Sequence, residues 1–96
     1  MTDVLRGEYI RVVFRGGNYL EGRLGFYGTW RVTNDMMDVI GLYTDDLDST
    51  LSKEPVDIRI MKGPTPLRVK LRIPTDSIER IELAGPRREK LIYHKL

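Results

Sequence analysis

Apolar and polar residues alternate along much of this chain, and the alternation predicts an all-β fold. Residues 10–15 place apolar side chains at Ile10, Val12 and Phe14, with arginine at Arg11 and Arg15. A period of two is typical of a strand that buries one face. Residues 16–18 then read Gly-Gly-Asn, residue types that tolerate the positive φ of a tight hairpin turn. Two antiparallel strands joined at this turn are therefore predicted.

The second predicted strand is long and sharply bent. Its inward positions are Leu20, Gly22, Leu24, Phe26, Gly28, Trp30 and Val32, and its outward positions are Glu21, Arg23, Tyr27, Thr29 and Arg31. An inward glycine lets a sheet coil without a side-chain clash, so Gly22, Gly25 and Gly28 are predicted as the bend positions. The alternation also assigns Trp30 to the core.

The remaining pattern predicts three more core strands and an insertion. Residues 37–43 form a short apolar strand, residues 67–73 alternate cleanly, and residues 78–83 close the sheet. Between them lie an acidic loop and a second alternating run at 56–60, so residues 43–66 are expected to be a long variable loop or an added hairpin.

The two ends of the chain are less regular. Thr2 or Asp3 can cap a short N-terminal helical turn that ends at Gly7. Residues 86–96 are expected to form a basic C-terminal tail, and their pattern fits a short helix or an added strand equally well. With 96 residues the chain supports one small core, so residues 1–85 are assigned to a single domain.

Composition restricts where the protein acts. No apolar run approaches the ~18 residues of a membrane helix, so no membrane partner is expected. The chain has no cysteine, and its first residues lack the basic and apolar segments of a secretory signal. A cytoplasmic location is therefore expected.

Charge is distributed unevenly along the chain. Residues 1–48 carry five basic and eight acidic side chains, whereas residues 49–96 carry eleven and six. Residues 58–73 hold five cations and no acid. A basic face interleaved with outward tyrosines favours a nucleic-acid partner, because cations hold the phosphates and rings stack on bases. The alternative is a set of solvated strand faces.

The chain offers little chemistry for catalysis. His94 is the only histidine and has no cysteine partner, so no metal site of the usual spacing is expected. The acidic residues Asp45, Asp46 and Asp48 lack the glycine and the distal glutamate of a calcium-binding loop. We expect a non-enzymatic protein with no cofactor, no metal and no small-molecule substrate.

Two stretches carry a family resemblance. In the first, Ile10, Val12 and Phe14 precede a glycine turn and the run Leu20-x-Gly22-x-Leu24. In the second, LRIPTDSIERIEL at residues 71–83 reads as an apolar strand, a turn and an isoleucine-rich strand. Both are similar to the two motifs of the Sm and LSm-like proteins. The resemblance implies a small, strongly bent five-stranded open barrel that assembles into a homo-oligomeric ring, a hexamer or heptamer, and binds single-stranded RNA in ribonucleoprotein assembly or RNA processing.

The resemblance also implies where RNA binds. The candidate RNA-binding residues are Asn34, Asp35, Met36, Met37 and Asp38, together with Arg31, Arg72, Thr75 and Asp76. Two departures alter the family's uridine pocket: Asp38 stands at the position of its asparagine, and Pro74-Thr75 replace its arginine-glycine pair. The adjacent methionines are either flexible binding contacts or gap fillers.

An open barrel leaves two strand edges with unpaired backbone groups. Residues 67–73 and 78–83 are the expected edges, and pairing with neighbouring copies would close a ring. The alternative is a monomer whose C-terminal LIYHKL covers an edge. Two other functions fit the same pattern: a protein-assembly scaffold that has lost its RNA pocket, and a small barrel that lies on duplex DNA through the outward cations of residues 67–73.

Overall fold

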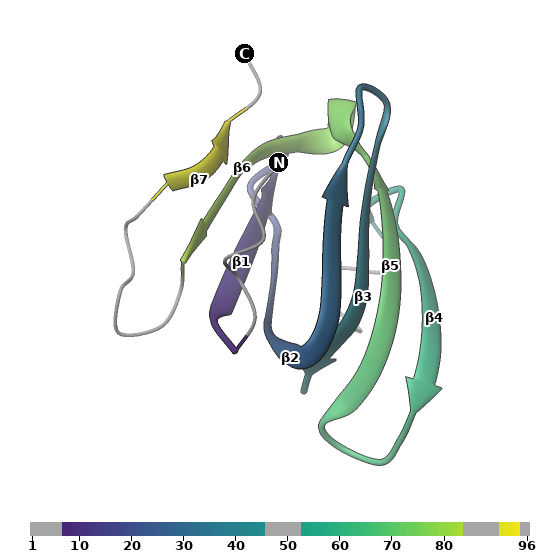
Figure 1. The fold of residues 1–96 in the computed structure, drawn as a ribbon. Helices are drawn as coiled ribbons and strands as arrows, with labels where there is room; N and C mark the ends of the chain where they lie inside the picture. Colours follow the sequence, from purple (N-terminus) through teal and green to yellow (C-terminus); the bar gives the residue numbers. More distant parts are fainter. Residues whose placement is uncertain (1–6, 46–52, 84–90, 95–96) are drawn as a thin grey trace.

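The alternating segments form one continuous antiparallel sheet (Figure 1). The computed structural model describes residues 7–45, 53–83 and 91–94, which contain seven strands and one turn of 3-10 helix. The strands are β1 (Tyr9–Phe14), β2 (Tyr19–Val32), β3 (Met36–Thr44), β4 (Asp57–Lys62), β5 (Leu67–Pro74), β6 (Ile78–Leu83) and β7 (Leu91–His94). The 3-10 turn, Thr75–Ser77, connects β5 to β6. The all-β prediction is confirmed for these residues.

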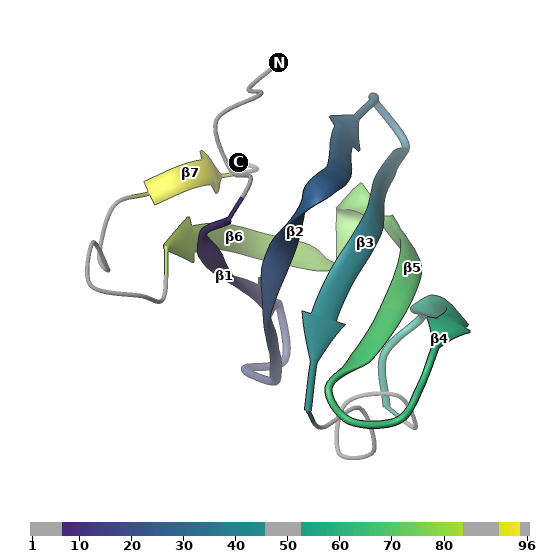
Figure 2. The same cartoon turned by 60° about the horizontal axis from the view of Figure 1, so that its bottom comes forward.

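The sheet is open and strongly curved. Its strand order is β4-β5-β3-β2-β1-β6-β7, so β4 and β7 lie at opposite ends (Figure 2). The first hairpin closes as predicted, with the Gly17 amide donating to the Phe14 carbonyl at 2.9 Å and the Phe14 amide to the Asn18 carbonyl at 2.8 Å. The residues after the hairpin therefore continue in antiparallel register with β1.

The core lies on the concave face of the sheet, where the inward residues of five strands meet. It consists of Ile10, Val12, Phe14, Leu20, Leu24, Met37, Val39, Leu42, Val69, Leu71, Ile73, Ile78, Ile81 and Leu83. These side chains come from β1, β2, β3, β5 and β6. Strand β4 contributes only partly buried Ile58, so it lies at the margin of the core.

β3 approaches β2 closely at Gly22. A side-chain carbon at this position would lie 2.6 Å from the Tyr43 carbonyl oxygen and 2.9 Å from Cγ of Leu42. Both distances are shorter than a van der Waals contact, so only glycine fits without moving β3. The prediction that a side chain at this inward position would clash is confirmed, whereas the register around Gly22 is regular and is interrupted only after Leu24.

The sharp bend of β2 lies at Gly25–Gly28 (Figure 1). Leu24 pairs with Leu42 and Thr29 pairs with Ile40, so four residues of β2 oppose one residue of β3. The prediction that Phe26 faces inward is wrong, because these unpaired residues interrupt the alternation and leave its side chain 77% exposed. Trp30 lies beyond the bend and packs against the core, as predicted.

The edges of the sheet differ from those predicted. Residues 67–73 belong to β5, which pairs with β3 on one side and with β4 on the other. Residues 78–83 form β6, which pairs with β1 and β7. The expectation that these two segments are free edges is wrong, because each is covered by a strand of the same chain.

These two covering strands also settle alternatives that the sequence left open. Residues 57–62 pair with β5, so the added hairpin extends beyond the expected range of 43–66, and Leu91–His94 form an added strand. The predicted helical turn at residues 2–7 and most of the acidic loop lie outside the described residues.

Candidate functional site

The predicted RNA-binding residues meet at the end of the sheet where β2 turns into β3. The Thr75 hydroxyl donates to the Asn34 carbonyl at 2.7 Å, and the Thr75 amide donates to the Asp35 carbonyl at 2.9 Å. These bonds hold the β2–β3 turn against the 3-10 turn after β5, so segments about 40 positions apart lie side by side.

Arg31, Asp38 and Arg72 lie in one row across the same end of the sheet. Arg31 of β2 pairs with Asp38 of β3, and Asp38 pairs with Arg72 of β5. The row continues to Asp57 of β4. Side chains opposite each other in an antiparallel ladder share a face. We call these four residues the turn row.

Asp38 is held by a two-pronged ion pair within the turn row. Arg72 Nε donates to Oδ1 of Asp38 at 2.8 Å, and Nη2 donates to Oδ2 at 3.3 Å. The hydrogen bond from Arg72 lowers the pKa of Asp38; partial burial opposes this, and the charges of Arg72, Lys70 and Arg31 act in the same direction as the bond. The carboxylate therefore remains ionised and its charge is compensated locally.

Replacing Asp38 with asparagine should cost no more than about 1 kcal/mol at neutral pH, because the pair is partly solvated. The pKa of Asp38 is lower in the folded than in the unfolded chain, so its contribution is present above the ordinary pKa of 3.8 and is lost as the pH falls through the folded-state value. The stability difference between wild type and Asp38→Asn should therefore shrink below this pH. Urea unfolding over a pH series measures it, and a difference that grows on acidification would contradict the ion pair.

Two of the nine predicted residues have side chains that do not reach the surface. Met37 is fully buried in the core and Thr75 is 1% exposed. The sequence predicts that Met37 is either a binding contact or a gap filler, and its burial shows that it fills a gap in the core. Thr75 has a structural role through its hydrogen bond to Asn34. The remaining charged members are three carboxylates and two guanidinium groups, so this site attracts phosphate weakly.

A second row at the other end of the sheet has a different composition. Tyr9 of β1 pairs with Arg23, Arg23 with Tyr43, Tyr43 with Arg68, and Arg68 with Lys62. We call these five residues the bend row, because Arg23 lies just before the bend of β2. Rings and cations alternate over its first four positions. It contains no carboxylate, unlike the turn row.

The contacts within the bend row are made by Arg23 and Tyr43. The Arg23 guanidinium carbon lies 5.0 Å from the centre of the Tyr43 ring, a cation–π arrangement. Tyr43 reaches this face because Gly41, with φ of +83°, forms a bulge in β3 and shifts the alternation by one residue. Tyr9 is 51% exposed, so an aromatic surface remains accessible beside the cations.

A neighbouring row adds more positive charge. Lys70 of β5 pairs with Arg59 of β4 on one side and with Ile40 of β3 on the other. Together with the bend row, these residues make the outer face of β5 and β4 basic between the bend and the turn row. The sequence pattern predicts the outward cations of β5, which are Arg68, Lys70 and Arg72. The register shows that, of these three, Arg72 is the one that pairs with aspartates.

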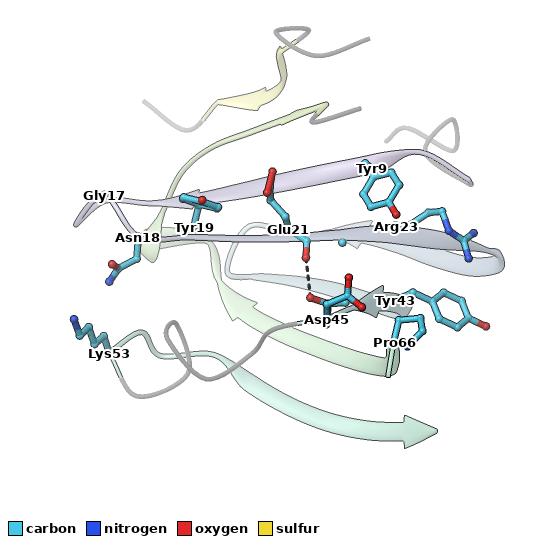
Figure 3. A pocket seen from close by; sticks show the side chains of 12 residues that line it. Tyr9, Gly17, Asn18, Tyr19, Glu21, Arg23, Tyr43, Asp45, Lys53 and Pro66 are labelled. Carbon is cyan, nitrogen blue, oxygen red and sulfur yellow. Dashed lines mark hydrogen bonds between the residues drawn. The ribbon is translucent and has the colours of Figure 1, made fainter. Parts of the chain in front are cut away.

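Three residues of the bend row, Tyr9, Arg23 and Tyr43, line one end of a groove of about 570 Å³ (Figure 3). Tyr9, Arg23, Tyr43 and Pro66 lie at this end, Asn18, Tyr19 and Lys53 at the other, and Glu21 and Asp45 between them. Arg11 compensates Glu21, with Nη2 2.8 Å from Oε2, and also contacts Glu82 at 3.2 Å. Each end of the groove therefore has one lining cation, Arg23 at the first end and Lys53 at the second.

The sequence pattern indicates Arg23 as an outward cation and places Arg68 and Lys62 in the basic segment 58–73, but it does not point to Tyr9 or Tyr43. Tyr9 extends the predicted outward positions of the first strand by one step, so its place could have been found. Tyr43 could not, because strict alternation from Met37 places it inward. Only the bulge at Gly41 turns it outward.

Within the described residues, no group of three or more metal-binding side chains is placed to hold an ion. Over the same ranges, no helix has the length and apolarity that crossing a membrane would require. Comparison of the chain with protein-family models, with curated proteins and with solved structures gives no match.

Proposed function

We propose that this protein is a non-enzymatic, Sm-like domain that binds single-stranded RNA on the outer face of its curved sheet. The five strands β5-β3-β2-β1-β6 surround the core and include both stretches that resemble the Sm and LSm-like motifs. The bent β2 and the glycine at position 22 support the same assignment. In this proposal β4 and β7 are additions at the margins of a five-stranded barrel.

The observation that carries the proposal is the bend row. Its five positions cross five strands and span roughly 19 Å, since neighbouring strands lie about 4.8 Å apart. Three cations with no opposing carboxylate attract a polyanion, and two rings in the same row supply stacking surfaces. The turn row lacks this excess of positive charge because its arginines face carboxylates.

Unpaired RNA fits this surface better than a duplex does. Aromatic side chains stack on base faces, which are accessible in a single strand and covered in a double helix. Rings alternate with cations along the bend row, so bases and phosphates can be contacted in turn. Stacking accepts every base, and we therefore propose binding with little sequence preference.

Ring assembly requires edges other than those predicted from the sequence. In the described ranges, β4 pairs only with β5 and β7 only with β6, so the outer sides of β4 and β7 are the accessible edges. We propose that β4 of one copy pairs with β7 of the next and closes a homo-oligomeric ring. Exposed Ile60 and Met61 on β4 give such a contact apolar area to bury.

Native mass spectrometry of the full chain tests both parts of the proposal. The protein is sprayed alone, with single-stranded RNA and with duplex DNA of equal length. We expect a closed oligomer that retains single-stranded RNA in preference to the duplex. A monomer that binds RNA would overturn the ring and keep the RNA function. A ring without nucleic acid would favour a protein scaffold, and preferential binding of the duplex would also overturn the proposal.

A further inference from the structure

The apex of the β2 bend presents two aromatic side chains to solvent. Phe26 is 77% exposed and Tyr27 is 87% exposed. Their ring centres are 5.9 Å apart with an interplanar angle of 66°, an edge-to-face pair. Neither ring belongs to the core cluster, so core packing does not account for two large rings at this position.

The backbone that carries these rings is fixed against β3. A side-chain carbon at Gly25 would lie 2.7 Å from Cε2 of Tyr43, and one at Gly28 would lie 3.0 Å from the Ile40 carbonyl oxygen. Both glycines are buried, whereas the two residues between them are exposed. The backbone of the apex is therefore held in place by β3 while its two rings point to solvent. Because this backbone is already ordered, a ligand that binds the rings loses little conformational entropy.

Two cations of the bend row, Arg23 and Arg68, lie at the base of this apex. Gly25 packs against the Tyr43 ring, which also carries the Arg23 guanidinium. On the other side, a side-chain carbon at Gly41 would lie 3.2 Å from Cα of Gly28 and 3.6 Å from the Arg68 guanidinium nitrogens. Positive charge therefore flanks the exposed rings on two sides.

We infer that Phe26 and Tyr27 form a base-stacking platform on which an unpaired nucleobase of single-stranded RNA is held while Arg23 and Arg68 contact its phosphates. This inference rests on the proposed function and assigns it a specific contact. The edge-to-face pair leaves ring faces open to solvent, as a stacked base requires. The paired residues on either side of the apex, from Arg23 to Arg68, include no carboxylate that would repel phosphate.

The test compares wild type with Tyr27→Ala and Phe26→Ala, using a mixed-sequence single-stranded RNA and an abasic oligomer of the same length. Each variant should weaken binding to the RNA by about tenfold, because stacking contributes about 1 to 3 kcal/mol per base. The dependence of affinity on salt should keep its slope, because no charge is removed. Binding to the abasic oligomer should be unchanged. Tyr19→Ala, an exposed ring at the far end of the groove and outside the bend row, is the matched control and should weaken RNA binding less than either apex variant.

The outcomes separate this inference from the function on which it rests. If wild type does not bind single-stranded RNA, the proposed function fails. If wild type binds and the Phe26→Ala/Tyr27→Ala double variant binds equally well, only the stacking platform fails. An equal loss of affinity for the abasic oligomer would overturn base stacking. A loss of self-association with RNA affinity intact would also overturn it, because the apex would then contact a second copy of the chain. Thermal unfolding should be nearly unchanged in these variants, because both side chains are exposed.

Discussion

Replacement of Gly22 by valine is expected to lower the free energy of unfolding by about 3 kcal/mol, at the upper end of the usual cost of overpacking. The added Cβ would lie 2.6 Å from the Tyr43 carbonyl oxygen, an atom of the β3 backbone. That backbone is fixed on both sides, because Tyr43 pairs with Arg23 of β2 and with Arg68 of β5. Relief of the clash would require β3 to move, and the β2–β3–β5 pairing would move with it.

Chemical denaturation followed by Trp30 fluorescence measures this change, because Trp30 packs against the core. Gly16→Ala is the matched control. Its added carbon would lie 3.8 Å from Oε2 of Glu54, an ordinary contact, and a change within about 0.5 kcal/mol is expected. Equal stability of Gly22→Val and wild type would show that β3 does not approach β2 closely enough to exclude a side chain at position 22.

The second large effect concerns nucleic-acid binding. The double substitution Arg23→Gln/Arg68→Gln is expected to weaken binding to single-stranded RNA roughly a hundredfold, since hydrogen bonds to charged groups contribute about 1.5 to 3 kcal/mol each. Both side chains lie in the bend row, where none of their cross-strand partners within the described residues is a carboxylate. Glutamine keeps much of the length and polarity of arginine, so the loss of RNA affinity reports mainly on the removed charge.

A fluorescence-anisotropy titration with labelled RNA provides the measurement. Arg80→Gln is the control, because Arg80 of β6 already contacts the carboxylates of Glu79 and Glu82. RNA affinity should be nearly unchanged in this variant. Equal losses in the double variant and in Arg80→Gln would mean that RNA is held by overall charge rather than by the bend row.

The strands could be predicted from the sequence because their burial follows a period of two. The inward positions Ile10, Val12 and Phe14 of β1 are buried, as are Val69, Leu71 and Ile73 of β5. The alternation fails where residues leave the ladder. The bulge at Gly41 turns Tyr43 outward and the bend at Gly25–Gly28 turns Phe26 outward, because each unpaired residue changes the side that the following residues face.

Strand partners were harder to predict than strands. An alternating run at 56–60 indicates a strand but does not say which edge it covers, so the covering of β5 by β4 was not predicted. The predicted site residues do lie together, because β3 and β5 are neighbours in the sheet. Their charge balance depends on cross-strand register, which pairs Asp38 with Arg72 and leaves the bend row without a carboxylate.

The dependence of single-stranded RNA affinity on salt tests the role of the bend row most directly. Three cations, Arg23, Arg68 and Lys62, have no carboxylate as a cross-strand partner in the described ranges, and they predict a slope of roughly −2 in a plot of log K against log salt concentration, at about −0.7 for each phosphate contacted on a single strand. Removing two of these cations should bring the slope close to −0.7. Affinity that does not change with salt, or no binding at low salt, would contradict the account.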